Sequence, residues 1–227
     1  MNEENDWELM EYENEDGDVF VVLAKDGAWQ SAAFVDVGMM YENVFQYCDA
    51  FDLMFDDCDG IKDVLMLGGG TFTYPMHIIA QCGVEHCDAV EIDEALLDVA
   101  YDFFHLGQFE KTHPGKLDKH FMDWRAYLAE CDKKYDAIVG DVYDGRQISD
   151  GFDNARVLEK IASCIKPGGV YVFNFVGNSD SEKEMGMEPC LDILERLFVD
   201  VTIVKVSDDM EDEKYCSYVV FAYKDKE

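Results

Sequence analysis

The chain has 227 residues, 48% of them hydrophobic, which suits one globular domain with a sizeable core. Fifty acidic residues against 18 basic ones give a formal net charge of −32, so we expect neither a nucleic-acid partner nor an anionic membrane to bind it. The charge is compatible with a cationic substrate such as a polyamine, although a solvated acidic surface is the simpler explanation.

Residues 1–17 are expected to form an acidic, solvated and disordered lead-in, because residues 1–18 contain nine acids and no Lys or Arg. Two β-rich runs follow, residues 18–25 and 28–37, and the Asp-Gly pair between them predicts a β-hairpin. Apolar side chains at helical spacing then predict one helix within residues 41–57, and with the hairpin this makes an N-terminal unit of residues 18–57.

From residue 58 to 227 the pattern changes to five strand–helix repeats, typical of a parallel sheet covered by helices. The strands are expected at 62–67, 87–92, 119–122, 135–141 and 170–176. The last two strands, 201–206 and 217–223, have only an acidic loop between them and should pair antiparallel, since a parallel crossover needs a dozen or more residues. The expected fold is α/β, a Rossmann-like methyltransferase fold with a mainly parallel sheet, a C-terminal antiparallel hairpin and a small N-terminal β-hairpin.

The first strand of the sheet runs into Gly68, Gly69 and Gly70 and then into a helix. Glycine permits backbone angles closed to other residues and lets a ligand approach the main chain. In open α/β sheets this turn is where nucleotide-like ligands bind. Glu91 ends the second strand about twenty residues later, where a carboxylate can hold ribose hydroxyls. Together the turn and the acid predict a nucleoside-bearing cofactor.

The eight cysteines are dispersed, and the acidic N-terminus lacks the features of a secretion signal, so reduced thiols and a cytoplasmic location are expected. No apolar run approaches the roughly 18 residues that a membrane helix needs. The grouping of Cys82, His86 and Cys87 lacks a second ligand pair at zinc-site spacing, so we expect packing roles and no metal.

Five blocks of sequence, at their relative spacing, resemble the spermidine synthase (polyamine aminopropyltransferase) group of the S-adenosylmethionine-dependent superfamily. The resemblance covers about nine-tenths of the chain. The blocks are Asp26–Gln30 at the hairpin turn, Gly68–Gly70, Val90–Asp93, Asp123 and Asp141–Asp144.

This resemblance implies S-adenosylmethionine or its decarboxylated form as cofactor, with Gln30 contacting it, Glu91 holding its ribose and Asp123 accepting from the adenine amino group. It also implies a homodimer paired through the N-terminal β region. The residues themselves leave alternatives open: Asp123 is a sound helix N-cap, Glu91 an ordinary strand-end acid, and Gln30 an exposed hairpin residue.

Asp141 and Asp144 are the candidate catalytic residues. An alkylammonium with a pKa of about 10.4 must lose its proton before it can attack the carbon beside a sulfonium, and a carboxylate can hold the cation and accept that proton. A polar turn is the alternative. Tyr143, between the two acids, and Tyr41 are candidate substrate-binding residues, and for both a packing role is at least as good an explanation.

Two departures from the family concern the donor. The glycine turn continues with Thr71 and Phe72 where the family has an acid and a glycine, and that acid normally faces the aminopropyl nitrogen. The hydroxyl of Thr71 can instead donate to the carboxylate of intact S-adenosylmethionine, and Phe72 should narrow the space. The leading function is aminopropyl transfer to a cationic amine; the alternatives are S-adenosylmethionine-dependent methyl transfer and a non-catalytic relative that binds the ligand.

Overall fold

The computed structural model describes residues 7–144, 147–148, 151, 153–177, 186–206 and 216–227. A seven-stranded sheet forms its centre, in the order β11-β12-β10-β7-β4-β5-β6. β4 (Asp63–Leu67), β5 (His86–Glu91), β6 (Leu117–Phe121), β7 (Tyr135–Gly140) and β10 (Ile165–Gly177) are parallel, which confirms the expected α/β sheet.

The C-terminal hairpin is also confirmed. β12 (Cys216–Tyr223) lies between β10 and β11 (Asp200–Val206) and pairs antiparallel with both. The strand order turns back at β4, because β5 and β6 extend the sheet on one side of it whereas β7 and β10 extend it on the other. A crevice at the carboxyl ends of β4 and β7 is therefore the expected place for a ligand.

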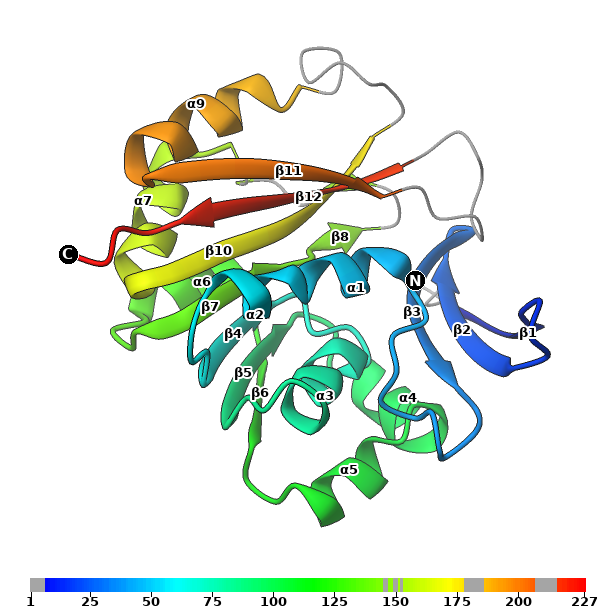
Figure 1. Cartoon of the computed structure of the whole chain (residues 1–227). Coiled ribbons are helices and arrows are strands. Elements are labelled where there is room, and N and C mark those ends of the chain that lie inside the picture. The colour runs from blue at the N-terminus through cyan, green and yellow to red at the C-terminus, as the bar shows by residue number, and fades with distance from the viewer. Residues whose placement is uncertain (1–6, 145–146, 149–150, 152, 178–185, 207–215) are drawn as a thin grey trace, which may run out of the picture.

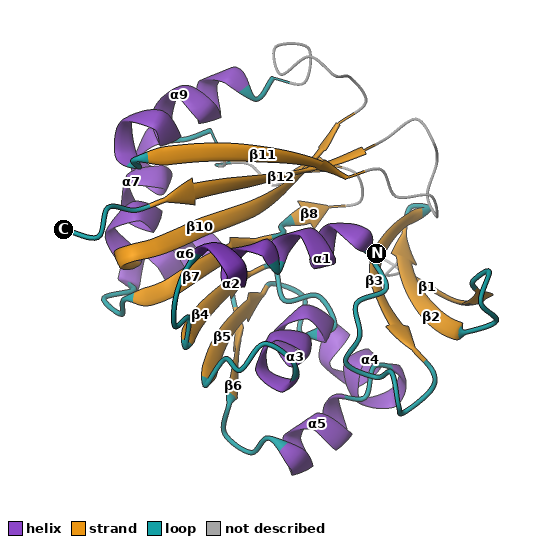
Figure 2. Cartoon of the chain, viewed as in Figure 1, coloured by secondary structure: helices purple, strands orange, loops and turns teal. Residues whose placement is uncertain are grey.

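Helices cover both faces of this sheet (Figures 1 and 2). β4 explains how, since its side chains alternate: Val64 and Met66 join one core cluster, and Leu65 and Leu67 join the other. The first face carries α1 (Gln46–Phe51), α2 (Leu53–Asp57), α3 (Thr73–Ala80) and α5 (Leu106–Thr112), and the second carries α6 (Trp124–Glu130), α7 (Ala155–Cys164) and α9 (Glu188–Leu197).

The N-terminal hairpin forms as predicted, from β2 (Val19–Lys25) and β3 (Ala28–Phe34). Asp26 and Gly27 both have positive φ, 52° and 73°, which fits the tight turn that joins twisted strands. α4 (Leu96–Phe103) and a third core cluster around Leu23 and Phe104 lie beside this sheet.

The prediction of a disordered lead-in is wrong for residues 7–13. These residues form β1 (Trp7–Glu13), which pairs antiparallel with β2. Most of its side chains are exposed, so the acids are solvated as expected, while Tyr12 packs on Trp29 with ring centroids 4.8 Å apart. Backbone pairing with a neighbouring strand and a few apolar contacts are enough to order an acidic edge strand. Residues 1–6 lie outside the described part of the chain, and the division into units 18–57 and 58–227 stays a prediction.

The single helix expected within 41–57 is also corrected. It consists of α1 and α2, joined at Asp52 by i to i−3 hydrogen bonds, and residues 41–45 are not helical. A long-range contact explains the late start, since the carbonyl of Tyr41 bonds Nδ1 of His77 at 2.6 Å. Hydrophobic spacing along one segment does not reveal such a partner.

Candidate active site

The glycine turn leaves β4 at the point where β7 ends beside it. Gly68 has φ +86°, and a side chain there would collide with the backbone of Asp141. Gly70 has φ +51°, and a Cβ there would lie 2.8 Å from Oγ of Ser31 on β3. Both positions therefore need glycine for conformation and for close packing. The turn brings main chain from β3, β4 and β7 together at one edge of the sheet.

Glu91 ends β5 with its carboxylate turned back toward this turn. Its Oε2 accepts from the amide of Gly70 at 2.8 Å, and its Oε1 accepts from the amides of Ile92 and Asp93 at 2.8 and 3.0 Å. Burial raises the pKa of Glu91, although these three amide hydrogen bonds oppose the rise. Three of about four acceptor positions are used, which leaves one for a hydroxyl group of a ligand.

Asp141 follows β7 and is held by two side chains from distant segments. Tyr47 of α1 donates its hydroxyl to Oδ2 at 2.9 Å, and Asn174 of β10 donates its amide to Oδ1 at 3.3 Å. Burial raises the pKa of Asp141 to about 6, against the opposing effect of these two bonds. A carboxylate with such a pKa is ionised at neutral pH and is a stronger base than an exposed aspartate.

These three features line one cavity of about 360 Å³, the size of a small-molecule site. β1 and β2 contribute Trp7 and Lys25, so the N-terminal sheet forms one wall. The acids in the lining outnumber the bases, which favours positively charged ligands. The charged lining residues are Lys25, Glu91, Asp93, Asp123, Arg125 and Asp141.

Most of the site residues predicted from sequence come together here. The cavity is lined by Gln30, Gly68, Gly69, Gly70, Glu91, Asp123, Asp141 and Tyr143. The ring of Tyr143 is fixed, because its hydroxyl donates to the carbonyl of Asn174 at 3.0 Å and accepts from the amide of Val176 at 2.9 Å. Asp144 lies in β8 (Tyr143–Asp144), but its side chain is outside the described part of the structure.

Tyr41 lies elsewhere, because its ring packs on Phe109 of α5 and its hydroxyl is 3.3 Å from Oγ1 of Thr112. Thr71 is fully buried below the turn, so its hydroxyl does not face the cavity, and that oxygen has no hydrogen-bond partner among the described residues. Both residues have contacts with segments far away in sequence: Tyr41 packs on Phe109, and the amide of Thr71 donates to Oγ of Ser31 at 3.2 Å.

Phe72 does not narrow the cavity as expected. It is fully buried and adopts the left-handed conformation with φ +65°. Its ring makes an edge-to-face contact with the ring of Phe121, with 6.2 Å between the centroids. The same ring lies under Gly69, where a Cβ would approach it to 2.8 Å. Burial of an aromatic ring thus offsets a backbone conformation that costs about 1 kcal/mol or more outside glycine.

Asp123 serves as the N-cap of α6, accepting from the amide of Arg125 at 2.8 Å. The guanidinium of Arg125 binds the same carboxylate at 2.6 Å. Its hydrogen bonds lower the pKa of Asp123, and they outweigh the opposing effect of burial. The cap suggested by sequence is confirmed. The carboxylate also borders the cavity, so a ligand contact stays a prediction.

Sequence reasoning missed Tyr47, Asn174 and Trp7. Tyr47 falls within the segment 41–57, whose apolar spacing predicted a helix and gave no sign of a polar role for its hydroxyl. A single polar residue in the middle of a buried strand was the available signal for Asn174, which is 2% exposed.

Residues 38–202 match the family described as the spermine/spermidine synthase domain. The chain belongs to this family. Among curated relatives, this spermidine-synthase-like chain is 32% identical over 119 residues to polyamine aminopropyltransferase 2 of Hyperthermus butylicus, covering 49% of this chain and 37% of that protein. It is 30% identical over 168 residues to the eEF1A lysine and N-terminal methyltransferase homolog of Drosophila pseudoobscura pseudoobscura, covering 69% and 23%. The matches to three aminopropyltransferases span 26% to 39% of their length.

Solved structures of a spermidine synthase and of a methyltransferase-like protein share the fold of this chain. Spermidine synthase from Thermotoga maritima superposes with a TM-score of 0.71 at 18% identity, covering 99% of this chain and 72% of that one. Human methyltransferase-like protein 13 in complex with SAH superposes with a TM-score of 0.59 at 23% identity, covering 78% and 76%. The Rossmann-like methyltransferase fold expected from sequence is thus confirmed. Across the described residues, no helix combines the length and apolar character that crossing a membrane would require.

Proposed function

We propose that this protein transfers an aminopropyl group from an adenosyl sulfonium donor to the nitrogen of a cationic amine. The observation that carries the proposal is one acidic cavity in which a glycine turn, Glu91 and Asp141 lie together at the turning point of the strand order. Relatives named as polyamine aminopropyltransferases support this reaction class.

The cavity suits an adenosyl ligand on three counts. The glycine turn lines the cavity, Glu91 keeps an acceptor position for a ribose hydroxyl, and Trp29 and Tyr143 offer aromatic surface. Gln30 borders the same space from the hairpin. Decarboxylated or intact S-adenosylmethionine would supply a carbon made electrophilic by the positive sulfur, and no metal is needed for that step.

Asp141 would hold the amine and accept its proton. The ammonium proton moves to a carboxylate oxygen of Asp141, and the freed nitrogen lone pair forms the new N–C bond as the C–S bond breaks. A base with a pKa of about 6 is ionised at neutral pH yet closer to the amine's pKa than an ordinary aspartate, so the transfer costs less. Tyr47 and Asn174 orient the carboxylate. We predict that Asp144 is the partner of Asp141 in binding the amine.

Calorimetry with the two donors and a turnover assay with di- and polyamines test the proposal. We expect the decarboxylated donor to bind, thioether product to form, and Asp141→Asn to abolish turnover while leaving donor binding within about threefold, since Asp141 acts on the amine. Preference for the intact donor, or no turnover with any amine, would contradict it.

Methyl transfer from intact S-adenosylmethionine is the second candidate. The family acid that faces the aminopropyl nitrogen is absent at Thr71, and one relative covering 69% of this chain is named a methyltransferase homolog. Methylated amine appearing with the intact donor only would establish this function instead. A homodimer and a cytoplasmic location stay predictions, which sedimentation and cell fractionation would test.

A further inference from the structure

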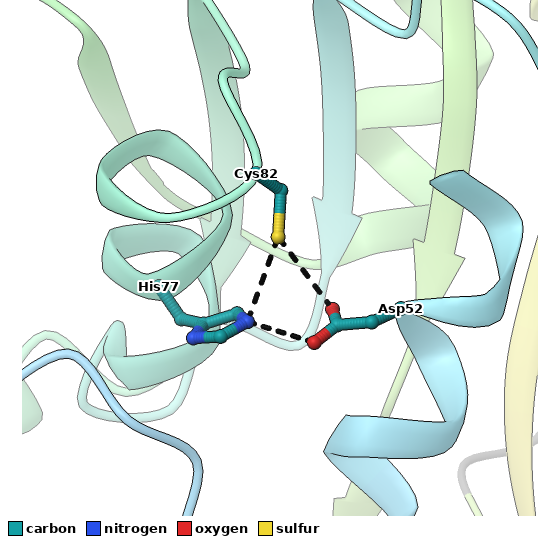
Figure 3. Close-up of side chains that lie close together, drawn as sticks. All are labelled: Asp52, His77 and Cys82. Carbon is teal, nitrogen blue, oxygen red and sulfur yellow. Dashed lines mark hydrogen bonds and ion pairs between the residues drawn. The ribbon is translucent and has the colours of Figure 1, made fainter. Parts of the chain in front are cut away.

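Behind the cavity wall, three side chains from separate segments converge on one point (Figure 3). They are Asp52 at the α1–α2 junction, His77 of α3 and Cys82, two residues beyond α3. Oδ2 of Asp52 lies 2.8 Å from Nε2 of His77, Sγ of Cys82 lies 3.6 Å from the same nitrogen, and Sγ lies 4.0 Å from Oδ1 of Asp52. None of the three lines the cavity described above.

These separations are close to those of a tetrahedral zinc site. Bonds of about 2.0 Å to nitrogen or oxygen and about 2.3 Å to sulfur, at tetrahedral angles, place ligand atoms about 3.3 to 3.6 Å apart. The nitrogen–sulfur distance already fits. The contacts of Asp52 use its two oxygens, Oδ2 to Nε2 and Oδ1 to Sγ, so rotation of the carboxylate must bring one oxygen to ligand distance from both atoms.

The orientation of His77 also fits a metal ligand. Its Nδ1 bonds the carbonyl of Tyr41 at 2.6 Å, which directs Nε2 toward Asp52 and Cys82. Metal-binding histidines commonly donate their second ring nitrogen to such a carbonyl. A Cys–His–Asp relay is excluded by the same geometry, because a relay places the acid and the nucleophile on opposite ring nitrogens, whereas here both face Nε2.

A second group of similar composition provides the contrast. His86, Asp88 and Asp118 also lie within ligand distance of one another, but the ammonium of Lys133 is 2.9 Å from Asp88 and 3.3 Å from His86. A lysine thus already supplies the cation there. In the part of the chain that the structure describes, Asp52 forms no ion pair with a Lys or Arg.

Charge favours a divalent ion in the first group. The carboxylate of Asp52 and a thiolate of Cys82 together supply two negative charges, which balance a doubly charged ion held with a neutral imidazole of His77. The side chains of His77 and Asp52 are 9% and 27% exposed, so an ion can enter from solvent. A ligand set of thiolate, imidazole and carboxylate selects zinc over magnesium or calcium.

We propose that Asp52, His77 and Cys82 bind a zinc ion, with water in the fourth position. The ion would clamp the α1–α2 junction to α3 and to the turn after it. Tyr74, on the first turn of α3, lines the cavity and donates its hydroxyl to Oδ1 of Asp52 at 3.0 Å. Zinc bound here would therefore also fix the wall of the donor cavity that Tyr74 forms.

Cobalt titration of the full chain, stripped of metal with a chelator, tests the proposal. We expect one Co²⁺ per chain to give a thiolate-to-cobalt absorption band that Zn²⁺ abolishes by displacement. Cys82→Ser should remove the band, and His77→Gln should weaken cobalt binding by more than about tenfold. Cys58→Ser changes a cysteine outside the cluster and should keep both the band and the cobalt affinity of the wild type. A missing band, or one that survives in Cys82→Ser, would overturn the site.

X-ray absorption of the zinc-loaded wild type gives a test that depends on no variant. The expected first shell holds one sulfur at about 2.3 Å and about three nitrogen or oxygen atoms at about 2.0 Å. A shell without sulfur, or with two or more sulfurs, would refute this ligand set. Zinc should also raise the unfolding temperature of the wild type and leave that of Cys82→Ser unchanged, and equal shifts in both would count against the clamp.

Discussion

Asp141→Asn should abolish turnover and yet make the protein more stable at neutral pH. The buried carboxylate is ionised there at a cost in free energy, which burial imposes and which raises its pKa from 3.8 to about 6. Asparagine has the same shape, carries no charge and can keep hydrogen bonds with Tyr47 and Asn174. The stabilising and inactivating effects of one substitution thus have the same origin.

The stability that Asp141→Asn gains over the wild type should increase with pH. Because the folded protein binds the proton of Asp141 more tightly than the unfolded chain, the contribution of Asp141 to stability is fully present below pH 3.8 and is lost as pH rises through about 6. At about 1.4 kcal/mol for each pH unit, the cost in the wild type is about 3 kcal/mol at pH 7.5 and about 1 kcal/mol at pH 4.5. The advantage of the variant should shrink by about 2 kcal/mol between these two values.

Urea unfolding of wild type and variant at both pH values measures this difference. Asp88→Asn is the matched control, since burial raises the pKa of Asp88 but the hydrogen bonds from Lys133 and His120 outweigh it and lower the pKa. This control should lose stability at pH 7.5, because it leaves a lysine without its buried partner. The reasoning is refuted if the gap between Asp141→Asn and wild type stays constant or widens as pH falls.

Three further substitutions probe the same cavity. Glu91→Gln should weaken donor binding in calorimetry about tenfold or more, because it removes a charged acceptor at the strand end. Tyr47→Phe removes a hydrogen bond that lowers the pKa of Asp141. The acid limb of the plot of turnover rate against pH should therefore shift to higher pH by up to about one unit. Gly69→Ala should cost about 1 to 3 kcal/mol of stability in urea unfolding, since its Cβ meets the ring of Phe72, and Phe72→Leu should recover part of that loss.

Each of these substitutions has a control or a contradicting outcome. Glu94→Gln changes an exposed acid beside the cavity and should leave the donor affinity within about twofold. Tyr41→Phe removes a hydroxyl outside the cavity and should not move the rate profile. If Tyr41→Phe and Tyr47→Phe shift the pH–rate profile equally, the hydrogen bond from Tyr47 to Asp141 does not set the pKa of Asp141. If Phe72→Leu recovers none of the stability lost in Gly69→Ala, a clash with the ring of Phe72 is not the cause of that loss.

The sequence was sufficient for the features that depend on short stretches of chain. Short apolar runs indicated the strands, and the Asp26-Gly27 pair indicated the hairpin. The glycines after β4 together with Glu91 after β5 indicated the edge of the sheet where we expect a ligand to bind. These signals are local, because strand period, turn conformation and glycine freedom are each decided within a few residues.

Tertiary structure alone decided which distant side chains meet. Asp141 acquired its raised pKa from burial, and its partners Tyr47 and Asn174 come from α1 and β10. Phe72 lies beneath the turn instead of in the cavity, and Asp52 reaches a histidine and a cysteine 25 and 30 residues away. Burial and long-range contact are properties of the packed chain, so no local pattern specifies them.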